Sequence, residues 1–103
     1  MINNHIAECW ENLCRLAVPF LEVDGKRFDI ASRWWGTTRD KQICEFDILA
    51  ESLDQKHLLI GECKWSNSGD IDKQLNELKT KALKLPFIDN YQLIIVVLQN
   101  SQY

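Results

Sequence analysis

Apolar side chains recur at two different spacings along this chain, and the change of spacing divides it into helices and strands. From residue 4 to residue 18 they follow a three-and-four-residue rhythm that places them on one face of a helix, and Pro19 stands just past its end. A second helix is predicted from Asp70, whose side chain can cap its first turn, to Leu85. Its apolar stripe consists of Ile71, Leu75, Leu78, Ala82 and Leu85.

Four other segments show the alternation or the continuous apolar character of β-strands. They cover residues 27–35, 42–52, 57–65 and 91–98. Short polar turns join the first three, which favours an antiparallel meander, whereas the fourth follows the second helix and should lie parallel to the third strand. The sequence therefore predicts a mixed α/β (α+β) domain of order αβββαβ, with three antiparallel strands, one parallel strand and both helices packed on the sheet.

Size and composition suit one globular domain. The 103 residues, 46% of them hydrophobic, suffice for a single core, so we expect one domain over residues 1–103. No apolar run is long enough to span a bilayer and no signal segment precedes the first helix, so we expect a cytoplasmic protein with no membrane partner. The net charge of −3 argues against a strongly basic, autonomous nucleic-acid binder. The four cysteines lack zinc-ligand spacing and are predicted to be buried thiols.

The hairpin formed by the second and third strands carries the candidate chemistry. If its turn centres between Asp54 and Gln55, opposed residues have numbers that sum to about 109. Asp47 then faces Glu62. Because side chains alternate along a strand, one face of this hairpin is predicted to hold Glu45, Asp47, Leu49, Leu58, Ile60, Glu62 and Lys64. The opposite, core face is predicted to hold Cys44, Phe46, Ile48, Ala50, Leu59, Gly61, Cys63 and Trp65.

Two carboxylates that face each other across a hairpin repel unless a cation lies between them. Mg²⁺ (or Mn²⁺) needs only one or two carboxylates together with waters and substrate phosphate, and it lowers the pKa of a bound water. Lys64, on the same predicted face, can hold that water or the scissile phosphate. The alternative is a solvated ion cluster in which Glu45 pairs with Lys64, and the spacing alone leaves both interpretations open.

The order and spacing of these residues resemble a known nuclease superfamily. Asp47, fifteen positions before Glu62, and the Glu62-Cys63-Lys64 triplet in αβββαβ order are similar to the PD-(D/E)XK superfamily of restriction enzymes and Holliday-junction resolvases. The strings CEFDILA and IGECKW, preceded by Arg33-Trp34-Trp35, resemble more closely the domain of unknown function that follows the P-loop motor of archaeal-type ATPases. Phe46 stands where the motif's namesake proline would be.

This resemblance, which runs from about residue 10 to residue 98, implies roles for individual residues. Asp47, Glu62 and a helical Glu11 would bind the metal, and Lys64 would assist the chemistry. Gln74 would face the site from the second helix. The resemblance also implies that the N-terminal ATPase domain of a parent protein is a partner, because this chain has no phosphate-cradling glycine loop of its own.

Aromatic and basic residues outside that group give further candidates for nucleic-acid contacts. Trp34, Trp35 and Trp65 can stack on bases, although at least two are expected in a core or domain interface. The lysines of the second helix can line a phosphate track or form a solvated face, and they are Lys73, Lys79, Lys81 and Lys84. The candidate contacts are Gln74, Lys73, Arg33 and Trp65.

Three functions follow as hypotheses. The first is a metal-dependent nuclease-like phosphodiesterase acting on nucleic acid, with DNA expected. The second is a catalytically silent nucleic-acid-binding or regulatory module of the same fold. The third is an interaction domain that uses its tryptophans as an exposed apolar surface.

Overall fold

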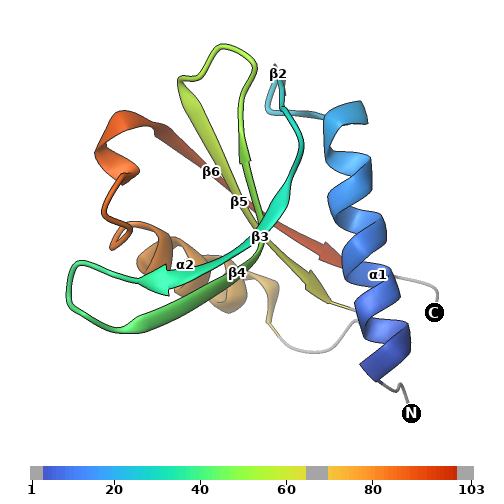
Figure 1. Cartoon of the computed structure of the whole chain (residues 1–103), viewed down its shortest axis with the longest axis horizontal. Coiled ribbons are helices and arrows are strands. Elements are labelled where there is room, and N and C mark those ends of the chain that lie inside the picture. Colours follow the sequence, from blue (N-terminus) through green and yellow to red (C-terminus); the bar gives the residue numbers. More distant parts are fainter. Residues whose placement is uncertain (1–3, 65–69, 100–103) are drawn as a thin grey trace.

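The order of helices and strands follows the predicted pattern, with one small hairpin added. The computed structural model describes residues 4–64 and 70–99. Its elements are α1 (Asn4–Ala17), η1 (Val18–Phe20), β1 (Glu22–Val23), β2 (Lys26–Arg27), β3 (Ser32–Thr37), β4 (Ile43–Glu51), β5 (His57–Lys64), α2 (Ile71–Ala82), η2 (Ile88–Asn90) and β6 (Gln92–Gln99). Strands β3, β4, β5 and β6 form one sheet in that order, antiparallel except for the parallel β5–β6 pair (Figure 1). The predicted α+β fold with a four-stranded mixed sheet and two helices is confirmed.

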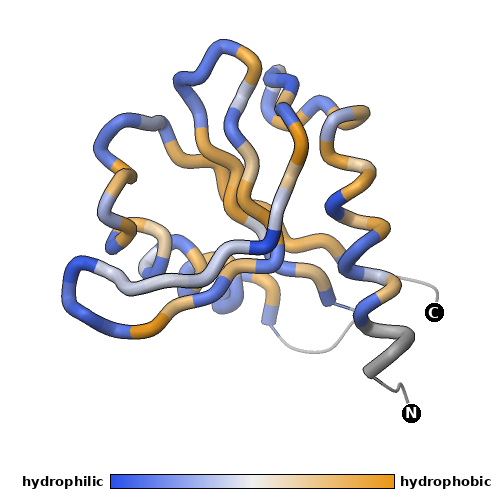
Figure 2. Tube along the Cα trace, viewed as in Figure 1, coloured by the Kyte–Doolittle hydropathy of each residue, from blue (hydrophilic) through white to orange (hydrophobic). Residues whose placement is uncertain are grey.

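Each face of the sheet is covered by one helix, and each helix closes its own core (Figure 1). The α1-side core contains Cys14, Val18, Phe28, Ala31, Ile48, Ala50, Leu59 and Cys63. The α2-side core contains Cys44, Phe46, Leu58, Ile60, Leu78, Ala82, Leu85 and Ile88. Strands β5 and β6 contribute to both faces, which explains their continuous apolar runs, residues 58–60 and 93–98 (Figure 2).

The first predicted strand, residues 27–35, is wrong at its beginning. Asp24 and Gly25 have positive φ angles of 54° and 75° and turn the chain into the β1–β2 hairpin. Phe28 makes only an isolated bridge to Ser52, and both Phe28 and Ala31 are buried on the α1 side. Two residues three apart cannot share one face of a regular strand, so this segment is irregular and β3 begins later.

The second helix also ends earlier than predicted. It stops at Ala82, after which Lys84 and Leu85 donate backbone hydrogen bonds to residues three positions earlier, in a tighter turn. That turn still places the Leu85 side chain in the α2-side core. The predicted cap is confirmed, because the Asp70 carboxylate accepts hydrogen bonds from the N–H groups of Asp72 and Lys73.

The predicted register of the β4–β5 hairpin is confirmed where the two strands pair. Ile48 lies opposite Gly61 and Glu51 lies opposite Leu58, which gives the expected sum of 109. The recorded ladder ends at Ile48 and Gly61. Beyond it β4 continues to pair with β3, and β5 continues to pair with β6, so the two central strands diverge (Figure 1).

A β-bulge accompanies this divergence. Ser32 pairs with Leu49 and Trp34 pairs with Phe46, so one residue of β3 lies opposite the two β4 residues Asp47 and Ile48. The bulge reverses the side-chain alternation. Phe46 and Cys44 therefore pack on α2, and the prediction that they share a face with Ile48 is wrong. Glu45 is correspondingly on the opposite face from the one predicted.

No helix within residues 4–64 and 70–99 is both long enough and apolar enough to cross a membrane.

Candidate functional site

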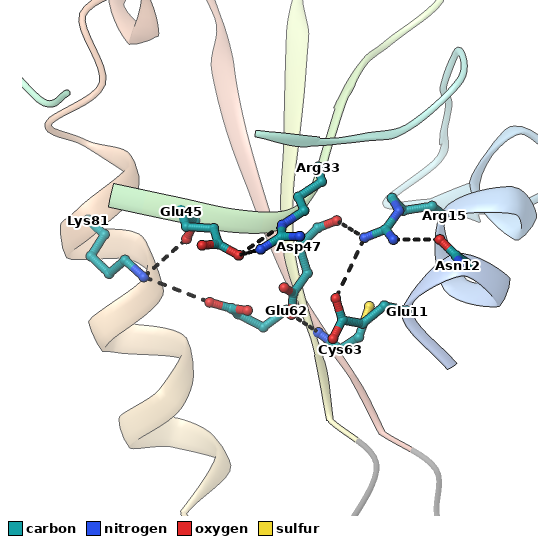
Figure 3. A network of polar contacts seen from close by, with 9 residues as sticks. All are labelled: Glu11, Asn12, Arg15, Arg33, Glu45, Asp47, Glu62, Cys63 and Lys81. Atoms are coloured by element: carbon teal, nitrogen blue, oxygen red, sulfur yellow. Dashed lines mark hydrogen bonds and ion pairs between the residues drawn. The ribbon is translucent and has the colours of Figure 1, made fainter. Parts of the chain in front are cut away.

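The bulge residue Asp47 lies at the point where β4 and β5 separate, and it is held from two sides. Its Oδ2 atom accepts a hydrogen bond of 3.0 Å from the backbone N–H of Cys63 on β5. Its backbone carbonyl accepts a hydrogen bond of 3.0 Å from Nη1 of Arg15 on α1 (Figure 3). The Asp47 carboxylate thus accepts the hydrogen bond that a backbone carbonyl of β4 would accept in a regular ladder. The two hydrogen bonds fix Asp47 relative to both β5 and α1.

Glu62 lies beside Asp47, as the sequence predicted. Burial is the largest cause that raises the pKa of Glu62, and a hydrogen bond with Asp47 and the negative charge of Asp47 raise it further, to about 8. Nearby Lys81 and Lys64 lower it in part. The protonated form of Glu62 is therefore favoured near neutral pH, because burial and the adjacent negative charge both disfavour its charged form.

Glu11 approaches Asp47 from α1. Partial burial raises the pKa of Glu11 first, and the charge of Asp47 raises it next, whereas Arg15 lowers it. Arg15 Nη1 lies 3.9 Å from the Glu11 carboxylate. In the view of Figure 3, Glu11 and Glu62 lie on opposite sides of Asp47. The structure therefore brings the three predicted acidic residues to one end of the sheet.

The three acids do not form a closed ligand cage. Within residues 4–64 and 70–99, no group of three or more His, Cys, Asp or Glu side chains is close enough to hold a metal ion. Asp47 and Glu62 alone remain as a pair of oxygen donors in mutual contact. Such a pair suits an ion that completes its coordination shell with water and a substrate phosphate, and Glu11 as a direct ligand stays a prediction.

Glu45 does not pair with Lys64, so that part of the ion-cluster alternative is wrong. Its carboxylate accepts hydrogen bonds from Arg33, at 2.9 Å from Nε and 2.5 Å from Nη2. The bulge is the physical reason, because it turns Glu45 toward Arg33 on the neighbouring strand β3. The guanidinium of Arg33 also lies over the ring of Trp35, 5.5 Å from its centroid.

A pocket of about 90 Å³ opens beside Glu62, between β5, α2 and β6. It is lined by Glu62, Lys64, Gln74, Glu77, Leu78, Lys81 and Val97. Lys64 and Gln74 were both predicted to face the site, and the structure brings both to the same pocket as Glu62. A volume of this size holds a few water molecules or a small oxyanion.

Lys81 is the site residue that sequence reasoning did not single out. Its Nζ lies 3.8 Å from the Glu62 carboxylate and 3.4 Å from the backbone carbonyl of Glu45. In the sequence it was one of four lysines considered together on the second helix. A signal was present, because Lys81 stands three residues after Leu78 and directly before Ala82, at the border of the buried stripe.

The remaining candidates that the structure describes do not line the pocket. Lys73 is exposed and does not line it, and Trp65 lies outside the described residues. Trp34 packs at the α2-side core, with its ring 5.9 Å from Phe46 and 5.8 Å from Phe87. Trp35 is 66% exposed. The expectation of buried thiols holds for three of the four cysteines, since only Cys9 is exposed.

Fold and site together describe a mixed α+β domain with a carboxyl pair at a strand divergence. Residues 1–82 match the family DUF234, described as archaea bacterial proteins of unknown function, and the chain belongs to that family. No curated protein and no solved structure matches the chain.

Proposed function

We propose that this chain is a metal-dependent nuclease-like domain of the PD-(D/E)XK type, which hydrolyses phosphodiester bonds in nucleic acid, with DNA as the expected substrate. One observation carries the proposal. Asp47 and Glu62 come into contact where β4 and β5 separate, and Lys64 lines the pocket beside Glu62. A pair of carboxyl groups beside a lysine supports the proposal, because such residues suit an ion-assisted phosphodiesterase.

The residues present fit a divalent ion. Burial and the neighbouring carboxyl group disfavour the charged form of Glu62, so its elevated pKa is the state expected of such a pair without a cation. Asp47 and Glu62 would hold Mg²⁺ or Mn²⁺, with Glu11 as a further acidic group near Asp47. When bound, the ion would supply a water of lowered pKa and would neutralise charge on a phosphoryl oxygen.

The chain's own residues position the reactants. The N–H of Cys63 holds the Asp47 carboxylate, and the guanidinium of Arg15 holds the Asp47 backbone carbonyl, so this residue is fixed beside Glu62. Lys64 binds a non-bridging phosphate oxygen and stabilises the charge that develops there. A water oxygen forms a new bond to phosphorus and releases a proton to solvent, the bond to the leaving oxygen breaks, and the leaving alkoxide takes up a proton from solvent.

The arrangement of elements supports the assignment to this superfamily. An αβββαβ order, three antiparallel strands and one parallel strand agree with the core that the sequence resemblance implies. The family is archaeal and bacterial, which agrees with a domain attached to an archaeal-type P-loop ATPase. We propose that ATPase domain as the partner within a parent protein, and the sequence of this chain contains no phosphate-binding glycine loop for ATP hydrolysis.

A second candidate is a catalytically silent module of the same fold that binds nucleic acid or a partner protein. Trp35 is 66% exposed and Ile43 is 90% exposed. Trp35 pairs with Glu45 and Thr37 pairs with Ile43, so the two apolar side chains are diagonal neighbours on one face of the β3–β4 hairpin. Two large exposed apolar groups side by side favour a binding surface.

A cleavage assay separates the two candidates. Single-stranded, double-stranded and branched DNA, and RNA, are incubated with the chain in Mg²⁺ or Mn²⁺ and compared with a reaction in chelator. We expect ion-dependent cleavage that Asp47→Asn and Lys64→Ala reduce by about 10²-fold or more. Glu45→Gln, which removes a carboxylate outside the pair, should retain activity. Absence of cleavage in the wild type, or equal cleavage by Asp47→Asn, would overturn the nuclease proposal and favour the silent module.

A further inference from the structure

The side chain of Lys81 contacts Glu62 of the candidate site and two residues of the adjacent strand β4. Its ammonium group lies 3.8 Å from Glu62 and 3.4 Å from the carbonyl oxygen of Glu45. It also lies over the ring of Phe46, 5.2 Å from the centroid. Figure 3 shows it reaching from α2 toward the opening between β4 and β5. One carboxylate of the site, one backbone carbonyl and one aromatic ring thus hold the lysine in place.

Stability of the fold explains little of this arrangement. The Lys81 side chain is 45% exposed, and its distance to Glu62 is at the long end for an ion pair. Partly exposed pairs of this kind contribute little to the free energy of unfolding, because water screens them. A contribution to stability therefore does not account for the position of Lys81, and the adjacent pocket indicates a role in binding.

The pocket receives two lysines from two different elements. Lys64 reaches it from β5 and Lys81 reaches it from α2, with Glu62 among the residues that line the pocket with them. A phosphate oxygen in this pocket would meet an ammonium donor from the strand and another from the helix. Lysine binds phosphate as a point charge, and its flexible stem allows the group to move between a carboxylate and a phosphate oxygen.

We propose that Lys81 is a second phosphate-binding residue, which contacts the nucleic-acid backbone together with Lys64. In the absence of substrate its ammonium group rests on Glu62 and the Glu45 carbonyl. When a phosphate group enters, the ammonium donates to a phosphate oxygen instead. This inference rests on the proposed function, because it assumes that the ligand of the pocket is a nucleic-acid phosphate.

The other lysines of this region provide matched controls. Lys79 belongs to the same helix and carries the same charge, but it does not line the pocket. Lys84 is paired with Asp40 at 3.1 Å, away from Glu62. Lys79→Ala therefore changes the net charge of α2 as Lys81→Ala does, and it leaves the pocket intact.

The test measures binding of fluorescently labelled DNA and RNA oligonucleotides to the full chain, in Ca²⁺, over a range of salt concentrations. We expect Lys81→Ala to weaken binding roughly uniformly across sequences and to reduce the slope of log affinity against log salt by about 1. Lys81→Arg should restore the slope, and Lys79→Ala should leave it at the wild-type value. The melting temperatures of the variants should agree closely with that of the wild type, because loss of the partly exposed Lys81–Glu62 pair costs little stability.

Three results would overturn the inference, and they differ in what else they overturn. If the wild type binds and cleaves nucleic acid while Lys81→Ala keeps the wild-type slope, Lys81 is only a counter-ion of Glu62 and the proposed function stands. A wild-type chain that neither binds nor cleaves any of the oligonucleotides would overturn both proposals. A loss of affinity in Lys81→Ala that comes with a lowered melting temperature would assign Lys81 a structural role instead.

Discussion

The two halves of the β4–β5 hairpin are built from the same two strands and have opposite properties. From Ile48 to Glu51 and from Leu58 to Gly61 the strands form a continuous ladder, and their apolar side chains enter the cores on both faces of the sheet. Past Ile48 and Gly61 the strands separate. There the hydrogen bond from Cys63 goes to the side chain of Asp47 and no longer to a neighbouring backbone.

The comparison shows how a sheet accommodates charged groups. In the closed half, backbone pairing and apolar burial support each other, so this half can hold the structure together. In the open half, the bulge and the divergence admit carboxyl groups that destabilise each other, as the elevated pKa of Glu62 shows. The closed half therefore supplies the stability that the open half lacks, and each half responds differently to mutation.

The largest effect is expected from the closed half. Ile60 is fully buried in the α2-side core, and Ile60→Ala removes apolar contacts and leaves a cavity. We expect the free energy of unfolding to fall by about 2–5 kcal/mol, measured by urea denaturation. Lys64→Ala, on the same strand in the open half, should change it by no more than about 0.5 kcal/mol. Similar losses for the two variants would remove the distinction between the halves.

The next effect belongs to the open half and depends on pH. The pKa of Glu62 is raised from 4.5 to about 8 in the folded chain, so between these values the folded state binds a proton that the unfolded state has lost. Stability should therefore be greatest below pH 4.5 as far as Glu62 is concerned, and should decrease as the pH rises to about 8, by on the order of a few kcal/mol. Comparison of Glu62→Gln with the wild type isolates this contribution, because the variant should lack the decrease. Parallel pH curves for the two proteins would contradict the assignment.

A somewhat smaller loss is expected at the boundary between the halves. A β-carbon added at Gly61 would lie 2.9 Å from the Val96 side chain and 3.2 Å from that of Ile48. Gly61→Ala should therefore force the strands apart and reduce the free energy of unfolding by about 1–3 kcal/mol, again measured by denaturation. Gly25→Ala serves as a comparison in which backbone conformation alone is strained. Its φ is 75°, and nothing lies within 4 Å of the added β-carbon. If Gly61→Ala were neutral, the close approach of β4, β5 and β6 at this point would be in error.

The smallest change is expected at the exposed rim of the open half. Glu45 and Arg33 form a hydrogen-bonded pair whose side chains are each about half exposed. Glu45→Gln should lower the free energy of unfolding by no more than about 1 kcal/mol, since water screens such pairs. A loss as large as that of Ile60→Ala would show that the exposed rim stabilises the fold as much as the core does. That result would contradict the difference in stability between the closed and open halves.

The sequence predicts the closed half better than the open half, and the reason is physical. The register follows from the turn, where Gln55 adopts a positive φ of 62° and the buried Ser52 accepts hydrogen bonds from the N–H groups of Lys56 and His57. These are local interactions, and local interactions leave a pattern in the sequence. The predicted closeness of Asp47 and Glu62 followed from that register.

The bulge at Asp47 and Ile48 could not be predicted, because it depends on how β3 packs against β4. For the same reason the faces of Phe46 and Glu45 were assigned wrongly. The β1–β2 hairpin could have been predicted, since Asp24-Gly25 is a common hairpin turn. Long-range packing determines the bulge and the faces of Phe46 and Glu45. The β1–β2 hairpin and the position of Lys81 each had a local signal in the sequence that was overlooked.

Divalent-ion binding tests most directly whether the open half is a metal site. The melting temperature of the full chain is measured with and without millimolar Mg²⁺ or Mn²⁺, for the wild type, Asp47→Asn and the control Glu45→Gln. An ion that binds only the folded chain should raise the melting temperature of the wild type and of Glu45→Gln by a few degrees. Asp47→Asn should show no rise. An unchanged melting temperature in the wild type, or an equal rise in Asp47→Asn, would contradict the account.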